Sequence, residues 1–157
     1  MDIGTSIKTV YSKYADFKGR AIRSEFWWYM LFYVAVGVGL DLIVPLAATI
    51  WDYANLVPVL AVTARRLHDT DRSGWWQTLP LAAVPIVVGA FFVGGGIDDF
   101  FLSDPFGSSS GILLVIGGLV GLALYILLIV WLATRGGEGP NRFGDDPMGR
   151  GDASVFE

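Results

Sequence analysis

The residues best able to carry out chemistry lie in one short stretch, residues 65–74, which reads RRLHDTDRSG. It holds the only histidine of the chain, His68, together with two aspartates and three arginines. The imidazole of His68, oriented by Asp69, could act as a general acid or base. No nucleophile pattern accompanies these two residues, so we treat His68 and Asp69 as weak catalytic candidates.

The same stretch makes a poor metal site. One histidine and two nearby aspartates supply too few strong ligands, and the chain has no cysteine. We therefore expect no metal and no cofactor. The lack of cysteine also excludes disulfide scaffolds, iron–sulfur clusters and thiol nucleophiles.

The arginines favour binding of an anion. Five guanidinium groups near residues 20–23 and 65–72 could lie at the depth of lipid phosphates. A cytoplasmic or membrane protein partner could use the same charges. The candidate residues for lipid or partner binding are Arg20, Arg23, Glu25, Arg65, Arg66, His68, Asp69, Asp71 and Arg72.

A structural alternative needs no ligand. In it, residues 65–74 form a salt-bridged loop that caps the neighbouring helices. The expected pairs are Arg20 or Arg23 with Asp69 or Asp71, and Glu25 with Arg65, Arg66 or Arg72. Because such pairs would be partly desolvated, they should matter more to stability than surface ion pairs.

The elements that position these residues are membrane helices. Of 157 residues, 54% are hydrophobic and 17% charged, and the mean hydropathy of +0.55 is too high for an ordinary soluble domain. The 39 residues from 26 to 64 carry only two formal charges, Asp41 and Asp52. A spanning helix needs about 20 apolar residues, so this run predicts two spans with a tight turn near residues 44–48.

Two further apolar runs, residues 75–93 and 112–133, complete the predicted fold. We expect an all-α integral membrane protein with four transmembrane helices in two hairpins. The membrane domain covers residues 24–134, with spans at about 24–44, 47–64, 74–93 and 112–133. An acidic, glycine-rich loop separates the last two spans at residues 94–111, and residues 135–157 should form a flexible cytoplasmic tail.

The basic residues predict the orientation. All eleven lysines and arginines lie before the first span, between the second and third, or after the fourth. The positive-inside rule therefore places both termini in the cytoplasm. The net charge of −4 excludes a generally basic nucleic-acid binder, so no nucleic-acid partner is expected.

Residues 1–23 precede the first span as a basic segment containing an amphipathic helix. Its apolar residues recur at helical spacing: Ile3, Ile7, Val10, Tyr11, Tyr14 and Phe17. The helix could lie on the cytoplasmic interface in contact with lipid, or pack on the cytoplasmic ends of the other helices. Neither arrangement requires an activity.

Three polar residues fall inside the predicted spans: Asp41, Asp52 and Asn55. Intramembrane carboxylates are candidates for proton or cation binding, although residues near the turn could instead reach water at the outer interface. Small residues at a spacing of four also occur, Ala35 with Gly39 and Gly117 with Gly121. This spacing permits close helix packing, either within one chain or in a homo-oligomer.

Three blocks of the sequence match a known pattern. Residues 19–28 read GRAIRSEFWW, residues 65–76 read RRLHDTDRSGWW, and residues 140–147 read PNRFGDDP. Over about residues 10–147 the chain resembles the bacterial domain-of-unknown-function (DUF) family 805. The resemblance implies a small protein of the bacterial inner membrane with several helical spans. All three blocks fall on the cytoplasmic side of the predicted topology, so we expect them to form one composite surface.

Three functions remain open at this point. The first is a non-enzymatic scaffold or regulatory subunit whose cytoplasmic face binds anionic lipid or a protein partner. The second is an oligomeric channel or transporter for a small ion or solute, using Asp52 and Asn55. The third is an enzyme acting on lipid headgroups through His68 and Asp69.

Overall fold

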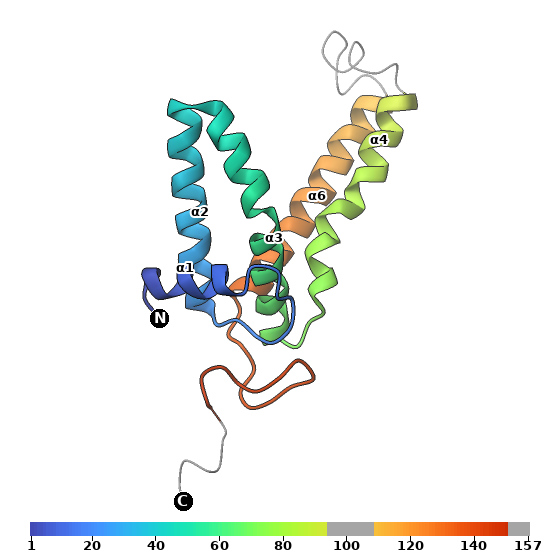
Figure 1. The fold of residues 1–157 in the computed structure, drawn as a ribbon. Helices are drawn as coiled ribbons and strands as arrows, with labels where there is room; N and C mark the ends of the chain where they lie inside the picture. The colour runs from blue at the N-terminus through green and yellow to red at the C-terminus, as the bar shows by residue number, and fades with distance from the viewer. Residues whose placement is uncertain (94–108, 151–157) are drawn as a thin grey trace, which may run out of the picture. The chain divides into compact units, whose positions relative to one another are not determined.

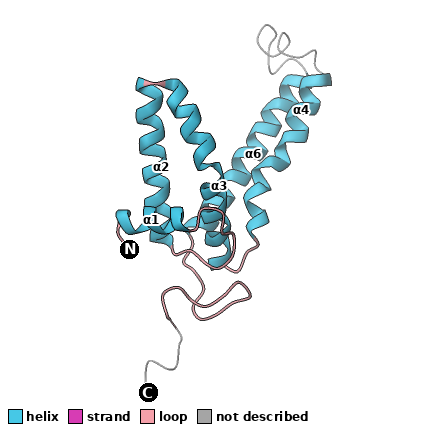
Figure 2. Ribbon diagram, in the orientation of Figure 1, coloured by secondary structure: helices cyan, strands magenta, loops and turns pink. Residues whose placement is uncertain are grey.

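The computed structural model describes residues 1–93 and 109–150 as helices joined by turns and loops (Figure 2). No strand occurs in this part of the chain, where residues Asn141 and Gly144 form an isolated bridge. Most of the acidic loop expected at residues 94–111 lies outside the described residues, as does the end of the predicted tail after Arg150.

The chain divides into two units, which are described separately. The first comprises residues 1–77 and 131–157 and contains α1 (Ile3–Ser12), α2 (Arg23–Ile43) and α3 (Pro45–Asp69). The second comprises residues 78–130 and contains α4 (Val84–Val93) and most of α6 (Ser109–Ala133) (Figure 1). A three-ten helix, η1 (Gly74–Ala83), begins in the first unit and ends in the second.

The first helix, α1, begins at an aspartate cap and packs against α2. The Asp2 carboxylate accepts hydrogen bonds from the Thr5 N–H at 2.9 Å and the Thr5 hydroxyl at 2.8 Å. Ser6 and Val10 are buried, and the Ser6 hydroxyl reaches the carbonyl of Ser24 at 3.4 Å. Of the six apolar positions expected to form one helix face, only Val10 is buried. Ile3 and Tyr11 are exposed, and Tyr14 and Phe17 are exposed and lie beyond the end of α1.

Helices α2 and α3 lie side by side and run in opposite directions, joined at Val44 (Figure 1). Pro45 occupies the first turn of α3, where its missing N–H costs no helical hydrogen bond. Inside α3, Pro58 leaves the carbonyl of Ala54 without its helical donor. The hydroxyl of Tyr14 donates to that carbonyl at 2.5 Å. The segment after α1 thus supplies the hydrogen bond that the proline cannot donate.

Two helix boundaries differ from the sequence-based expectation. The helix expected at residues 47–64 continues to Asp69, so Arg65 and Arg66 belong to its last turns and not to a loop. The expected span at 74–93 is not one α-helix but η1 followed by α4, because Pro80 and Pro85 each remove a backbone donor. Among the described residues, three helices are long and apolar enough to cross a membrane: Arg23–Ile43, Pro45–Asp69 and Gly111–Ala133.

In the second unit, α6 approaches α4 and the end of η1 through glycines. A Cβ added to Gly117 would lie 2.9 Å from the Cγ2 of Val87, and one added to Gly121 would lie 3.3 Å from the Cβ of Ala83. Both glycines therefore serve helix packing within this unit. In the first unit, Ala35 is exposed and a Cβ at Gly39 would meet no atom within 4 Å, so that pair makes no comparable contact.

Candidate functional site

The three sequence blocks meet where α2 begins and where α3 and α6 end. We call this region the charged end and define it as residues 19–25, 65–73 and 131–150. All of it belongs to the first unit. Because α3 continues to Asp69, Arg65, Arg66 and Asp69 lie on its last turns, where they are buried. The other two sequence blocks cover these turns.

Asp69 is at the centre of the charged end. Its Oδ1 accepts a hydrogen bond from the Nε of Arg20 at 3.0 Å, and its Oδ2 accepts one from the Nη1 of Arg66. The three side chains are at most 3% exposed. Two guanidinium groups thus neutralise one buried carboxylate and provide the hydrogen bonds that a buried charge requires.

The remaining donors of the two arginines bind backbone carbonyls. Arg66 donates through Nε to the carbonyl of Leu132 at 2.9 Å and through Nη2 to that of Thr134. These carbonyls belong to the end of α6, where helical partners are missing. Arg20 donates to the carbonyls of Gly139 at 2.6 Å and Gly137 at 2.5 Å. The arginines therefore attach residues 132–139 to the end of α3.

Arg65 forms a second buried pair with Glu25. Its Nη1 lies 3.2 Å from Oε1 of Glu25, and the side chains are 0% and 6% exposed. Neither these two atoms nor the Nε and Nη2 of Arg65 form a hydrogen bond of good geometry with any described residue. The contact is therefore an ion pair in which each charge offsets the desolvation of the other. The backbone carbonyl of Arg65 accepts from the N–H of Ala21 at 3.0 Å.

The side chain of His68 is packed against other residues of the charged end. Its ring stacks on that of Phe143, with centroids 3.9 Å apart and planes 2° from parallel. Its Nδ1 lies 3.0 Å from the carbonyl oxygen of Gly19, and its own carbonyl accepts from Asn141 at 2.9 Å. The expected acid–base arrangement of His68 and Asp69 is not formed, because Asp69 faces arginines and His68 faces Phe143.

The other candidate charges lie at the edge of the charged end. Asp71 pairs with Arg142 at 3.1 Å, with both side chains 63% exposed. The guanidinium of Arg72 lies 4.7 Å above the ring of Trp131, within cation–π distance. Arg23 is exposed and has no ion pair with any described residue. The structure therefore separates the candidate arginines into a buried set (Arg20, Arg65, Arg66) and an accessible set.

Residues 135–150 contribute more to the charged end than their composition suggested. Asp146 accepts hydrogen bonds from the Met148 N–H at 3.0 Å and from the Arg150 Nε at 3.0 Å. Burial raises the pKa of Asp146, but the hydrogen bonds from the Arg150 side chain and the Met148 N–H have the larger effect. Together they lower the pKa from 3.8 to about 2. The glycine-rich composition of this segment gave no indication of these contacts, whereas the block at 140–147 did.

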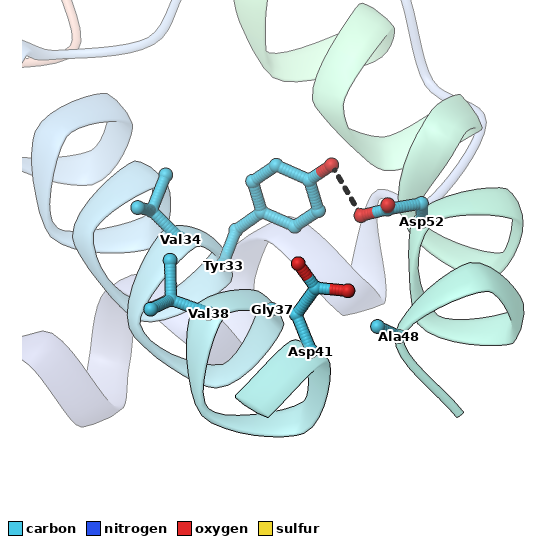
Figure 3. Close-up of a pocket in the computed structure, with 7 residues that line it drawn as sticks. All are labelled: Tyr33, Val34, Gly37, Val38, Asp41, Ala48 and Asp52. Carbon is cyan, nitrogen blue, oxygen red and sulfur yellow. Dashed lines mark hydrogen bonds between the residues drawn. The ribbon is translucent and has the colours of Figure 1, made fainter. Parts of the chain in front are cut away.

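The polar residues of the predicted spans, Asp41, Asp52 and Asn55, occupy two different environments. Asp41 and Asp52 line a pocket of about 260 Å³ between α2 and α3, where Tyr33 donates to Asp52 at 2.9 Å (Figure 3). Asn55 does not line this pocket. It is buried one turn further along α3, where its Oδ1 accepts from the hydroxyls of Tyr11 at 2.8 Å and Tyr29 at 2.9 Å. Asp52 and Asn55, which the sequence grouped together, are thus separated.

No group of three or more histidine, cysteine, aspartate or glutamate side chains placed to hold a metal ion occurs within residues 1–93 and 109–150. Three acidic side chains of the charged end, those of Glu25, Asp69 and Asp146, are instead paired with arginines.

Comparisons with known proteins agree with the sequence blocks. A family model described as "Protein of unknown function (DUF805)" matches residues 14–145. Inner membrane protein YhaI of Escherichia coli (strain K12) is 34% identical over 146 residues, covering 88% of this chain and 92% of the relative. Inner membrane protein YhaH of the same organism is 29% identical over 149 residues, with the same coverage.

A third relative, Uncharacterized protein YiiR of Escherichia coli (strain K12), is 28% identical over 138 residues, covering 83% of this chain and 85% of the relative. No solved structure matches the chain. The family match spans most of the sequence and includes nearly all of the three blocks that form the charged end, so the chain belongs to the DUF805 family.

Proposed function

We propose that this protein is a non-enzymatic scaffold or regulatory subunit of the inner membrane, whose charged end faces the cytoplasm and binds anionic lipid headgroups or a protein partner. The observation that carries the proposal is the buried arrangement of Asp69 between Arg20 and Arg66. These groups hold three distant parts of the chain together, which is what a rigid platform needs. Their burial leaves them unavailable to a substrate.

The environment of His68 supports a scaffold over an enzyme. A general acid or base needs a ring nitrogen within hydrogen-bond reach of the substrate. In this protein His68 is only 9% exposed, one face of its ring is covered by Phe143, and its Nδ1 contacts the carbonyl of Gly19. The histidine thus joins residues 19, 68 and 143, in agreement with a structural role.

The proposed topology has four membrane passes in two hairpins and both termini in the cytoplasm. For the third pass, ten residues of three-ten helix at about 2 Å each and ten of α-helix at about 1.5 Å each extend about 35 Å, enough for a hydrocarbon core of about 30 Å. The separation of all eleven basic residues from the opposite end supports the orientation.

A cysteine-accessibility experiment tests the topology, because the chain has no native cysteine. Lys18→Cys and Arg142→Cys should be protected from a membrane-impermeant maleimide in intact cells and react after lysis. Leu42→Cys, in the last turn of α2 at the end opposite Arg23, should react in intact cells. Labelling of Arg142→Cys from outside would overturn the proposed orientation.

Lipid preference tests the function. The purified protein should retain phosphatidylglycerol in preference to phosphatidylcholine of the same chain length when bound lipids are counted by native mass spectrometry. Turnover of either lipid that is lost in His68→Gln would contradict the scaffold proposal and support the enzyme.

A second candidate function, binding or transfer of a small cation or proton, is favoured by the pocket in Figure 3. Asp41 on α2 and Asp52 on α3 both line it, and carboxylates facing one cavity inside membrane helices are suited to cations. Proton or sodium flux in reconstituted vesicles that is lost in Asp52→Asn, but kept in the exposed control Asp71→Asn, would favour this function. Equal flux in empty vesicles would exclude it.

A further inference from the structure

A cavity of about 510 Å³ opens at the charged end, beside the first turn of α2. Its lining includes Arg23 and Ser24 from α2, Arg135 and Gly136 after α6, and Arg150. Arginines from three separate places in the sequence thus meet around one space. We propose that this cavity is a binding site for a phosphate-bearing anion, an inference that rests on the proposed cytoplasmic orientation and lipid contact of the charged end.

The three arginines lining the cavity can reach a ligand. Arg23 is exposed and is not ion-paired to any described residue. Arg135 pairs with Glu138 at 3.0 Å, but the side chains are 70% and 63% exposed, so water screens the pair and a phosphate can replace the carboxylate. Arg150 uses Nε and Nη2 for Asp146, while its Nη1 makes no hydrogen bond within residues 1–93 and 109–150.

The carboxylates near the cavity are already neutralised. Asp69 also lines it, but its charge is held between Arg20 and Arg66 and its side chain is 3% exposed. Asp146 is held by Arg150. Among the residues that line the cavity, three arginines stand against one carboxylate, that of Asp69. An anion therefore meets an excess of positive charge.

The start of α2 adds to this charge. Ile22, the residue before the helix, has no side chain able to cap it, and the structure has no side-chain cap there. The first N–H groups of a helix lack backbone partners and carry partial positive charge, which favours an anion at that position. The only acid of the first turn, Glu25, is turned away into its pair with Arg65.

The position of the cavity along α2 suits a lipid phosphate. Trp27 and Trp28 follow Arg23 by about one turn and are 39% and 41% exposed. Tryptophan side chains favour the interface between hydrocarbon and headgroups, so Arg23 should lie at headgroup depth. The phosphate of an anionic headgroup and a free phosphate share the chemistry recognised here, and experiment can distinguish them.

The test compares single-charge variants of the full-length protein in neutral detergent. Arg23→Gln removes a charge inside the cavity, and Lys18→Gln removes an exposed charge outside its lining. The probes are phosphatidylglycerol, followed by native mass spectrometry, and inorganic phosphate, followed by thermal stabilisation. Because one arginine near a lipid surface contributes about 1 kcal/mol, Arg23→Gln should weaken binding roughly fivefold and Arg23→Gln with Arg135→Gln roughly 25-fold.

The outcomes separate the two ligand sources and the two proposals. Weakened phosphatidylglycerol binding in the Arg23 variants, with Lys18→Gln unchanged, supports a headgroup site. Weakened binding of inorganic phosphate alone supports a site for a free phosphate. Variants that behave like Lys18→Gln with both probes overturn the site, while the wild-type preference for phosphatidylglycerol would leave the proposed function intact. A wild type with no preference for phosphatidylglycerol would overturn lipid binding as the function, and the cavity would then remain an anion site only if the Arg23 variants weaken binding of inorganic phosphate.

Discussion

Arg20 and Asp69 are 49 residues apart in the sequence, yet the Nε of Arg20 lies 3.0 Å from the Oδ1 of Asp69 and both side chains are almost fully buried. Arg66 binds the other oxygen of the same carboxylate. The carboxylate therefore connects the segment before α2 with the end of α3, and through the two arginines it also connects both with residues 132–139.

Replacing Asp69 by asparagine should destabilise the protein strongly. The amide keeps the size of the side chain but leaves the buried guanidinium of Arg66 without its counter-charge, while Arg20 keeps only the Asp146 carboxylate, 4.0 Å away. A loss of about 3–5 kcal/mol is typical when one partner of a buried ion pair is removed. Thermal unfolding in detergent would measure it. Asp71→Asn is the matched control, since Asp71 and Arg142 are both 63% exposed and such pairs contribute at most about 1 kcal/mol. Equal melting temperatures for the two variants would contradict a structural role for Asp69.

Gly136 should tolerate no larger residue, because a Cβ there would overlap the carboxylate of Asp69. We expect Gly136→Ala to displace either the carboxylate or residues 136–139, and to lower the melting temperature. The neighbouring control is Gly137→Ala, whose nearest atom would be the Asp69 carbonyl oxygen at 3.8 Å, an ordinary contact. Limited proteolysis should cut after Arg135 faster in Gly136→Ala than in Gly137→Ala, and equal rates would refute this close approach.

Asn55 should hold α1 in place. Its side-chain oxygen accepts from Tyr11 and Tyr29, and its Nδ2 donates to the carbonyl of Trp51 at 2.8 Å. Asn55→Leu would leave the hydroxyl of the buried Tyr29 without this acceptor, at a cost of about 1–3 kcal/mol, and would remove the hydrogen bond to Tyr11. Amide exchange in residues 3–12 should become faster. Tyr53→Phe, at a side chain that is 74% exposed, should leave that exchange unchanged.

The long apolar runs made α2, α3 and α6 predictable, since their residues have no other means of burying so much apolar surface. The pairs Arg20–Asp69 and Glu25–Arg65 were also among those expected from the sequence, because charged groups beside a membrane need partners. The sequence did not predict that α3 continues through Arg65 and Arg66. Their burial depends on carboxylates and helix-end carbonyls that only the folded chain brings within reach.

The contacts of residues 135–150 were hidden for a different reason. In these contacts the segment contributes backbone carbonyls, such as those of Gly137 and Gly139, which accept hydrogen bonds from Arg20. Every residue has such a carbonyl, so no side-chain pattern marks the ones that are used. The division of residues 74–93 into η1 and α4 was, in contrast, signalled by Pro80 and Pro85, which the hydrophobic pattern alone does not weigh.

Gly117 should be required for packing of α6 in the second unit, whereas its neighbour Gly118 should not. A Cβ at Gly117 would lie 2.9 Å from Val87 and 3.3 Å from Ile86, while one at Gly118 would meet nothing within 4 Å. Gly117→Leu should destabilise the protein by about 1–3 kcal/mol, as is usual for overpacking. Resistance to unfolding in mixed detergent measures this. Greater sensitivity in Gly118→Leu, together with loss of an oligomer, would instead assign these glycines to contacts between chains.

Acid should release the C-terminal part of the charged end in a defined range of pH. Asp146 has a pKa of about 2, below its ordinary value of 3.8, since hydrogen bonds from Arg150 and Met148 outweigh the effect of burial. A carboxylate with a lowered pKa contributes stability that is complete above pH 3.8 and is lost as the pH falls through about 2. The Nε–H resonance of Arg150 should therefore move with a midpoint near pH 2. Asp146→Asn should abolish this transition and Asp145→Asn should keep it, because of these two aspartates it is Asp146 that binds the guanidinium. A midpoint near 3.8 in the wild type would mean that the ion pair contributes nothing to holding residues 146–150.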